Sequence, residues 1–183
     1  MRKVKMIRFP LEAELVPTGT WGANLRALLP PSGWNRLRSH YYEKADHKCE
    51  ICGETGFTQN RNHAVEAHES WEYDDVSHTQ TLTGIQALCP RCHMVKHYGR
   101  SMSVGGLNVV REHIAKVNGW DASDMILLYE QLIFDTHSMR SRFRWEVRVE
   151  KQLRKWLDAG ILKQRDVDKA LENLKKAKYD GED

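Results

Sequence analysis

The chain has 183 residues, enough for one domain with its own hydrophobic core or for a small domain with attached helices. Its formal net charge is only +3, which does not by itself imply nucleic-acid binding, so the distribution of charge matters more than the total. No apolar run approaches the roughly 20 residues of a membrane helix, and the basic N-terminus lacks the apolar core of a signal peptide. We therefore expect a protein of the reducing cytoplasm, in a bacterial or virus-infected cell, with no membrane partner.

Short elements are expected before the first cysteine. Residues 2–9 alternate weakly between apolar and charged side chains, which indicates a strand that Pro10 ends. A short helix is predicted within 18–29, with Thr20 as its N-cap. A longer helix is predicted over 32–45, because apolar residues recur there at helical spacing, and it leads to the first cysteine.

The four cysteines form two CxxC pairs, Cys49 with Cys52 and Cys89 with Cys92, and none is left over. Two intervening residues suit a metal knuckle better than a disulfide, and no βαβ pattern surrounds the pairs as in a thioredoxin-like redox motif. Four thiolates close a tetrahedral site around zinc and leave no position for a reacting water. The pairs therefore predict a structural Zn²⁺ that holds together the two ends of the segment between them.

Two strands and a helix are expected around these pairs. Val65 and Ala67 alternate with polar residues and predict a strand over 63–70. A second apolar alternation, within 82–88, predicts another strand that leads into Cys89. The residues after Cys89 predict a helix, so a strand pair and a helix meet at the second cysteine pair.

Three histidines lie outside the thiolate site and form a second candidate metal site. His93 and His97 are one turn apart on the expected helix, so both imidazoles point the same way. His68 lies on the expected first strand beside the carboxylate of Glu69. Three nitrogen ligands leave open positions on a divalent ion for water and phosphate, and the candidate ions are Mg²⁺, Mn²⁺ or a second Zn²⁺.

The order of these motifs resembles the HNH endonucleases. CxxC is followed by a strand with a histidine-containing dyad, a second short strand and CxxCHxxxH, and the resemblance covers roughly residues 34–100. It implies an α+β fold in which a small ββα-metal finger, braced by a four-cysteine zinc site, is flanked by mostly α-helical N- and C-terminal segments. It also implies catalytic roles for four side chains: Glu69 as general base, and a divalent ion bound by His68, His93 and His97.

The chain departs from the family pattern at two positions. Glu69 stands where the family usually has the histidine base, and Gly84 stands where it usually has an asparagine that orients the base. A carboxylate serves as a general base if its pKa is suitable, so the first change is compatible with catalysis. An alternative register places His68 at the base position and Ala67 at the metal position, which leaves two ligands on the helix.

The remainder of the chain has mostly helical patterns. Residues 99–106 are rich in glycine and serine and predict a linker. A helix is expected over 107–117, another from Asp121 or Ser123, and a last one from Asp166. The apolar residues Met125, Leu128 and Leu132 of the middle helix recur at helical spacing, and Ile133 is a further candidate for the same face.

A basic stretch between residues 138 and 156 is the candidate nucleic-acid surface outside the finger. Aromatic residues at 143, 145 and 156 are interleaved with its cations and suit stacking on bases. The alternative interpretation is a solvated helix face, since Glu146 and Glu150 dilute the charge. The candidate contacts are Arg140, Arg142, Arg144, Arg148 and Lys151.

We expect three segments: an N-terminal strand and helix over 1–31, the HNH-like module over 32–100 and a helical region with the basic stretch over 107–183. The first functional hypothesis is a metal-dependent endonuclease that hydrolyses phosphodiester bonds, in DNA more than in RNA. The second is an inactive HNH-type zinc protein that binds nucleic acid or a protein partner as an adaptor.

Overall fold

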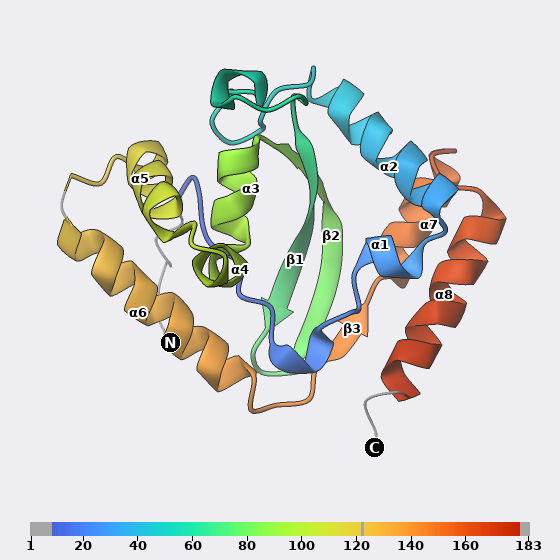
Figure 1. Ribbon diagram of the computed structural model, residues 1–183. Coiled ribbons are helices and arrows are strands. Elements are labelled where there is room, and N and C mark those ends of the chain that lie inside the picture. The colour runs from blue at the N-terminus through green and yellow to red at the C-terminus, as the bar shows by residue number, and fades with distance from the viewer. Residues whose placement is uncertain (1–8, 122, 180–183) are drawn as a thin grey trace, which may run out of the picture.

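The structure, a computed structural model, describes residues 9–121 and 123–179. Its centre is an antiparallel hairpin of β1 (Glu66–Asp74) and β2 (Thr79–Leu88), and β3 (Glu146–Arg148) pairs parallel with the start of β2 (Figure 1). The α+β class expected from the sequence is therefore confirmed, and both strands of the expected hairpin are present.

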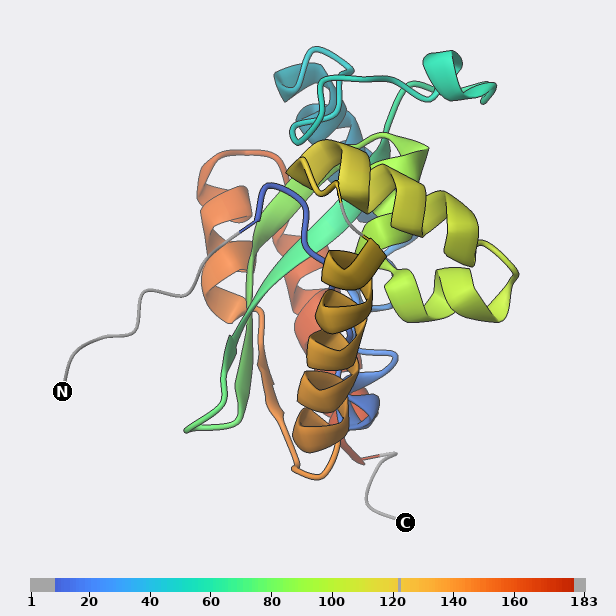
Figure 2. The ribbon, with the colours of Figure 1, turned by 90° about the vertical axis from the view of Figure 1, so that its left-hand side faces the viewer.

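Four helices lie on the left of the hairpin in Figure 1, and Figure 2 shows them from that side. They are α3 (Pro90–Lys96), α4 (Tyr98–Ser103), α5 (Leu107–Asn118) and α6 (Ser123–Arg140). Their core includes Val95, Tyr98 and Ile114. It also takes in Leu11 of the N-terminal segment and three buried cysteines, so the thiols belong to this side of the molecule.

The other side of the hairpin is covered by a second set of helices (Figure 1). They are α1 (Leu25–Leu28), α2 (Pro31–Lys44), α7 (Glu150–Asp158) and α8 (Gln164–Tyr179). Pro31 opens α2 because the first turn of a helix needs no backbone donor there. The core on this side joins Leu37 of α2 and Leu153 of α7 to Leu82 and Ile85 of β2.

Several predicted elements need correction. The short helix expected within 18–29 is α1, preceded by a 3-10 turn, η1 (Thr18–Thr20), and its N-cap is Asn24 and not Thr20. The expected linker over 99–106 is helical as far as Ser103, and only its last residues connect α4 to α5. The strand expected over 2–9 lies outside the described residues except for its final position.

Most of the apolar repeat of α6 does not face the core, and only Ile133 of its candidates packs there. Met125, Leu128 and Leu132 are 40%, 68% and 61% exposed, whereas Tyr129 is buried and Phe134 packs against the core. Apolar residues occur on more than one side of this helix, so helical spacing alone could not identify the buried face.

Both cores draw on all three segments expected from the sequence. The core on the right of the hairpin combines Leu25, Leu37 and Leu153, and the other combines Leu11, Val95 and Ile114. No helix within the described residues is long and apolar enough to cross a membrane. The helices instead pack their apolar residues against the hairpin and against one another.

Candidate functional site

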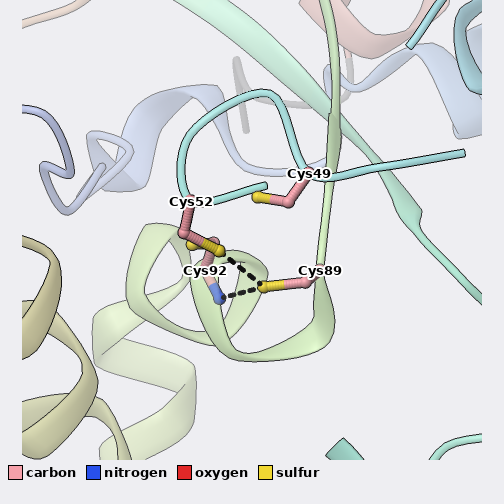
Figure 3. Close-up of side chains that lie close together, drawn as sticks. All are labelled: Cys49, Cys52, Cys89 and Cys92. Atoms are coloured by element: carbon pink, nitrogen blue, oxygen red, sulfur yellow. Dashed lines mark hydrogen bonds between the residues drawn. The ribbon is translucent and has the colours of Figure 1, made fainter. Parts of the chain in front are cut away.

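The two cysteine pairs lie in two different kinds of turn that the fold brings together (Figure 3). Cys49 and Cys52 lie in the loop after α2, where Gly53 has a positive φ of 75° and donates its N–H to the Cys49 carbonyl at 2.9 Å. Cys89 follows β2 and is the N-cap of α3, and its sulfur accepts from the Cys92 N–H at 3.5 Å. One pair therefore comes from a loop and the other from the start of a helix.

The four sulfur atoms converge on one point. All lie within 4.8 Å of one another, and Cys52 Sγ is 3.6 Å from Cys89 Sγ. Sulfur ligands at about 2.3 Å from a tetrahedral zinc ion are about 3.8 Å apart, so this arrangement is compatible with a structural zinc site. Hydrogen bonding with Cys49 lowers the pKa of Cys89 and raises that of Cys92, as expected for close thiols that compete for one negative charge.

His113 of α5 is a further member of this cluster that the sequence did not reveal. It is buried, and its Nε2 lies 3.2 Å from Cys92 Sγ. An imidazole N–H that donates to a thiolate stabilises the negative charge and fixes the orientation of a metal ligand. No motif could have indicated this pair, because the two residues lie on different helices 21 positions apart.

We expect Cys89→Ser to unfold the side of the protein that contains α3 and α5. The substitution removes a thiolate at the N-cap of α3 and leaves the other three cysteine sulfurs without a fourth partner, and structural metal sites stabilise small modules strongly. Metal content and the loss of helical circular dichroism on heating measure the effect. Arg91→Ala, an exposed residue between the second pair of cysteines, is the matched control, and equal melting of the two variants would contradict the prediction.

The three predicted imidazoles also come together, between β1 and α3. The ring centroids of His68, His93 and His97 are 4.6 to 5.5 Å apart, and Nε2 of His93 lies 3.1 Å from Nε2 of His97. Rings that bind one ion at about 2.1 Å have centroids about 4.6 to 5.6 Å apart for ligand angles between about 90° and 120°. The donor set therefore fits a single divalent cation.

A carboxylate orients His93 within this cluster. Nδ1 of His93 donates to Glu66 Oε2 at 2.5 Å, so the neutral ring carries its lone pair on Nε2, which faces His97. The other oxygen of Glu66 accepts from His63 at 2.8 Å. The hydrogen bond from His93, against the opposing effect of burial, lowers the pKa of Glu66 to about 2. A carboxylate that binds the outer nitrogen of an imidazole is typical of metal sites.

His68 is enclosed in the protein, with only 4% of the residue exposed. Burial lowers its pKa, and burial also lowers the pKa of His97 to about 4. Both rings are therefore neutral at pH 7, and neutral imidazoles bind metal ions. Neither ring nitrogen of His68 has a hydrogen-bond partner of good geometry, which is uncommon for buried polar atoms, and the one lone pair of the neutral ring is available to a ligand.

Glu14, which belongs to none of the sequence motifs, reaches the same cluster. Its Oε2 lies 3.3 Å from Nε2 of His68, and its Oε1 lies 3.2 Å from Nζ of Lys96. Burial acts to raise the pKa of Glu14, but His68 and Lys96 together hold it below its usual value. The site therefore contains an ionised carboxylate that comes from outside the expected finger.

The structure does not bring Glu69 to the imidazoles, which corrects the expected position of the base. Neighbouring residues of a strand face opposite sides, so His68 faces α3 while Glu69 faces α1, where its carboxylate accepts from the Leu25 N–H at 2.8 Å. Ala67, the metal position of the alternative register, also packs against the core on that side. Burial raises the pKa of Glu69 to about 7.

Gly84 is paired with Ser70 in the hairpin, next to an irregularity in the register between Ser70 and Trp71. Its backbone does not require glycine, since a Cβ at this position would meet no atom within 4 Å. The side chain that orients the base in the HNH family therefore has no counterpart at this position.

We expect Glu69→Gln to become more stable than the wild type as the pH rises. Folding raises the pKa of Glu69 from 4.5 to about 7, so the folded protein holds this proton more tightly than the unfolded chain. The resulting contribution to the free energy of unfolding is complete below pH 4.5 and is lost as the pH rises through 7. The wild-type free energy of unfolding should fall relative to that of the variant by about 2 kcal/mol between pH 5 and pH 8, measured by urea denaturation. Glu72→Gln, an exposed residue of the same strand, controls for the change of charge, and a pH-independent difference would contradict the prediction.

The predicted basic stretch is divided among the end of α6, a loop, β3 and the start of α7. Arg140 is engaged within the protein: its guanidinium donates twice to Asp75 and lies over the rings of Tyr73 and Trp145. Trp145 and Trp156 are buried and cannot stack on a base. The exposed side chains of the stretch include Arg142, Phe143, Arg144, Arg148 and Lys151. Arg148 pairs with Glu146.

Comparison with known proteins gave no match: no protein-family model, no curated protein and no solved structure matches the chain. The resemblance to the HNH endonucleases therefore rests on the motifs of the sequence. Any function must be argued from the two side-chain clusters and their surroundings.

Proposed function

We propose that the protein is an HNH-type endonuclease that hydrolyses phosphodiester bonds of nucleic acid, in DNA more than in RNA. Its structural Zn²⁺ would bind at the four cysteines and a divalent ion, Mg²⁺, Mn²⁺ or a second Zn²⁺, at the three histidines. The observation that carries the proposal is the convergence of His68, His93 and His97 on one point, next to a thiolate cluster that includes the N-cap of the same helix.

The two clusters support different roles because their donor sets differ. Four thiolates fill a tetrahedral ion and leave no position for water, so Cys49, Cys52, Cys89 and Cys92 serve structure. Three imidazoles leave positions open, and His93 is partly exposed to solvent, so a phosphate can approach this cluster. The histidine cluster is therefore the part of the proposal that concerns chemistry.

Each residue at the histidine cluster has a defined task. His68, His93 and His97 present imidazole nitrogens, and Glu66 holds a proton of His93 at Nδ1 so that Nε2 faces the cluster. A divalent ion held there supplies stabilisation of negative charge on the scissile phosphate and lowers the pKa of a bound water. Glu69 has no role at the reacting phosphate in this proposal, because its carboxylate binds the start of α1.

The exposed part of the basic stretch supports the nucleic-acid substrate. Arg142 and Arg144 lie in the loop between α6 and β3, and Phe143 between them is 45% exposed and stacks on His78. Two cations that flank an accessible ring suit contact with a phosphate backbone and with a base. Arg140 supports this loop from within instead of contacting the substrate, since Asp75 binds its guanidinium.

We expect His93→Ala and His97→Ala to lower metal-dependent nicking of supercoiled plasmid by roughly 100-fold or more, because each removes a ligand of the divalent ion. Agarose gels in Mg²⁺ or Mn²⁺ measure the rate. The zinc bound at the cysteines and the thermal melting should stay near those of the wild type, since neither histidine belongs to the thiolate cluster. His40→Ala, an exposed residue of α2, is the control.

Two results would overturn the proposal. One is nicking by His93→Ala at the wild-type rate. The other is a wild-type protein, loaded with zinc, that cleaves no duplex or single strand in either Mg²⁺ or Mn²⁺.

The double variant Arg142→Ala, Arg144→Ala should bind duplex DNA more weakly than the wild type, and its binding should depend less on salt concentration. Each phosphate contact releases counterions, so the loss of two contacts should reduce the slope of log K against log salt by about 2. Fluorescence anisotropy at several salt concentrations measures the slope. Arg38→Ala, an exposed residue of α2, should leave it unchanged, and equal slopes for the double variant and the wild type would contradict the assignment.

The adaptor hypothesis has one specific observation in its favour. Glu69 faces away from the imidazoles and Gly84 provides no side chain, so both positions that supply and orient the base in the HNH family are changed here. As an adaptor, the protein would bind nucleic acid with the same basic loop and would not cut it. Salt-dependent binding without cleavage in the assays above identifies this function.

A further inference from the structure

The N-terminal segment that precedes η1 is fixed to the helices around the histidine cluster. Leu11 exchanges two hydrogen bonds with the side chain of Asn118, at 3.0 and 2.9 Å. The N–H of Ala13 donates to the Tyr129 hydroxyl at 2.7 Å, and the N–H of Glu14 donates to the Lys96 carbonyl at 2.9 Å. Residues 11–14 are thereby attached to α3, α5 and α6 together, and Glu14 is held at the end of α3.

The side chain of Glu14 faces the cluster from this position. Its Oε2 lies 3.3 Å from His68 Nε2, while Lys96 occupies its other oxygen at 3.2 Å. His68 is 4% exposed, and neither of its nitrogens has a hydrogen-bond partner of good geometry. Such a ring is stabilised when one nitrogen donates to a carboxylate and the other binds a ligand.

The pair of Glu66 and His93 already shows this arrangement, with a carboxylate at one ring nitrogen and the other nitrogen free for a ligand. Glu66 accepts from Nδ1 of His93, and the opposite nitrogen, Nε2, faces the other imidazoles. At His68 the carboxylate of Glu14 lies on Nε2, so the nitrogen opposite to it is Nδ1. Two carboxylates from distant parts of the chain thus each contact one imidazole of the cluster.

We propose that Glu14 is a positioning residue of the histidine cluster: it keeps the proton of His68 on Nε2, so that the Nδ1 lone pair binds the divalent ion. This inference rests on the proposed function for the presence of the ion. It assigns to the N-terminal segment, which lies outside the HNH-like region, a part of the site.

The tautomer of His68 tests the proposal without substrate or divalent ion. In protein labelled with ¹⁵N-histidine and carrying Zn²⁺ at the cysteines, long-range ¹H–¹⁵N spectra report which ring nitrogen bears the proton. His68→Gln identifies the signals of His68. We expect the Nε2–H form in the wild type and in Glu14→Gln, whose amide oxygen still accepts, and a mixture of tautomers in Glu14→Ala. An Nδ1–H form in the wild type would overturn the proposal.

Metal affinity provides the second readout. Co²⁺, titrated into the zinc-loaded protein and followed by visible absorption, should bind to Glu14→Ala about 10-fold to 100-fold more weakly than to the wild type. Glu14→Gln should recover most of the affinity. Glu12→Ala removes a carboxylate of the same segment that contacts the Phe9 N–H and no imidazole, and should bind Co²⁺ like the wild type.

These measurements separate the failure of this inference from the failure of the proposed function. Wild-type affinity for Co²⁺ in Glu14→Ala, with its His68 tautomer unchanged, would overturn the role of Glu14 even if the protein cuts DNA. The expected tautomers and affinities in a protein that cuts no nucleic acid would support the role of Glu14 while the nuclease proposal fails.

Discussion

Cys89 joins the parts of the molecule on which the site depends. It follows the last residue of β2, it is the N-cap of α3, and its sulfur lies among those of three other cysteines. Because this one residue fixes where α3 begins, it also determines where His93 and His97 lie relative to β1. The thiolate cluster and the imidazole cluster are therefore coupled through a single short helix, although their chemistry differs.

The alternation of side chains along β1 divides the protein into two halves. His68 and Glu66 face the imidazole cluster, whereas Ala67 and Glu69 face the helices on the other side of the hairpin. Helices pack on both faces of this strand, so each of its side chains contacts only one half of the protein. The same geometry that gathers three histidines also excludes the adjacent glutamate from them.

Local patterns in the sequence were sufficient for much of this fold. The CxxC spacing indicated which cysteines meet, and the four-residue spacing of His93 and His97 placed two imidazoles on one side of a helix. The strand period also predicts that His68 and Glu69 face opposite sides, whereas the HNH dyad places its two members at one site. The structure follows the strand period, because Glu69 binds the start of α1.

Other features had no local signal. Glu14 and His113 reach the two clusters from elements distant in the chain, and such contacts depend on how helices pack around the hairpin, which no spacing rule specifies. The buried side of α6 was likewise undetermined, because apolar residues lie on both sides of that helix. The aromatic residues of the basic stretch suggested stacking on bases, yet Trp145 and Trp156 are needed to fill the interior.

The hairpin separates two hydrophobic cores, and this separation affects how the protein can open locally. The thiols, the imidazoles and the N-terminal segment all belong to one half, while α2, α7 and α8 pack on the other. Local opening of the first half can therefore expose the thiolates to a metal donor while the second half stays folded. An ion bound at the four cysteines would stabilise mainly the half that contains them.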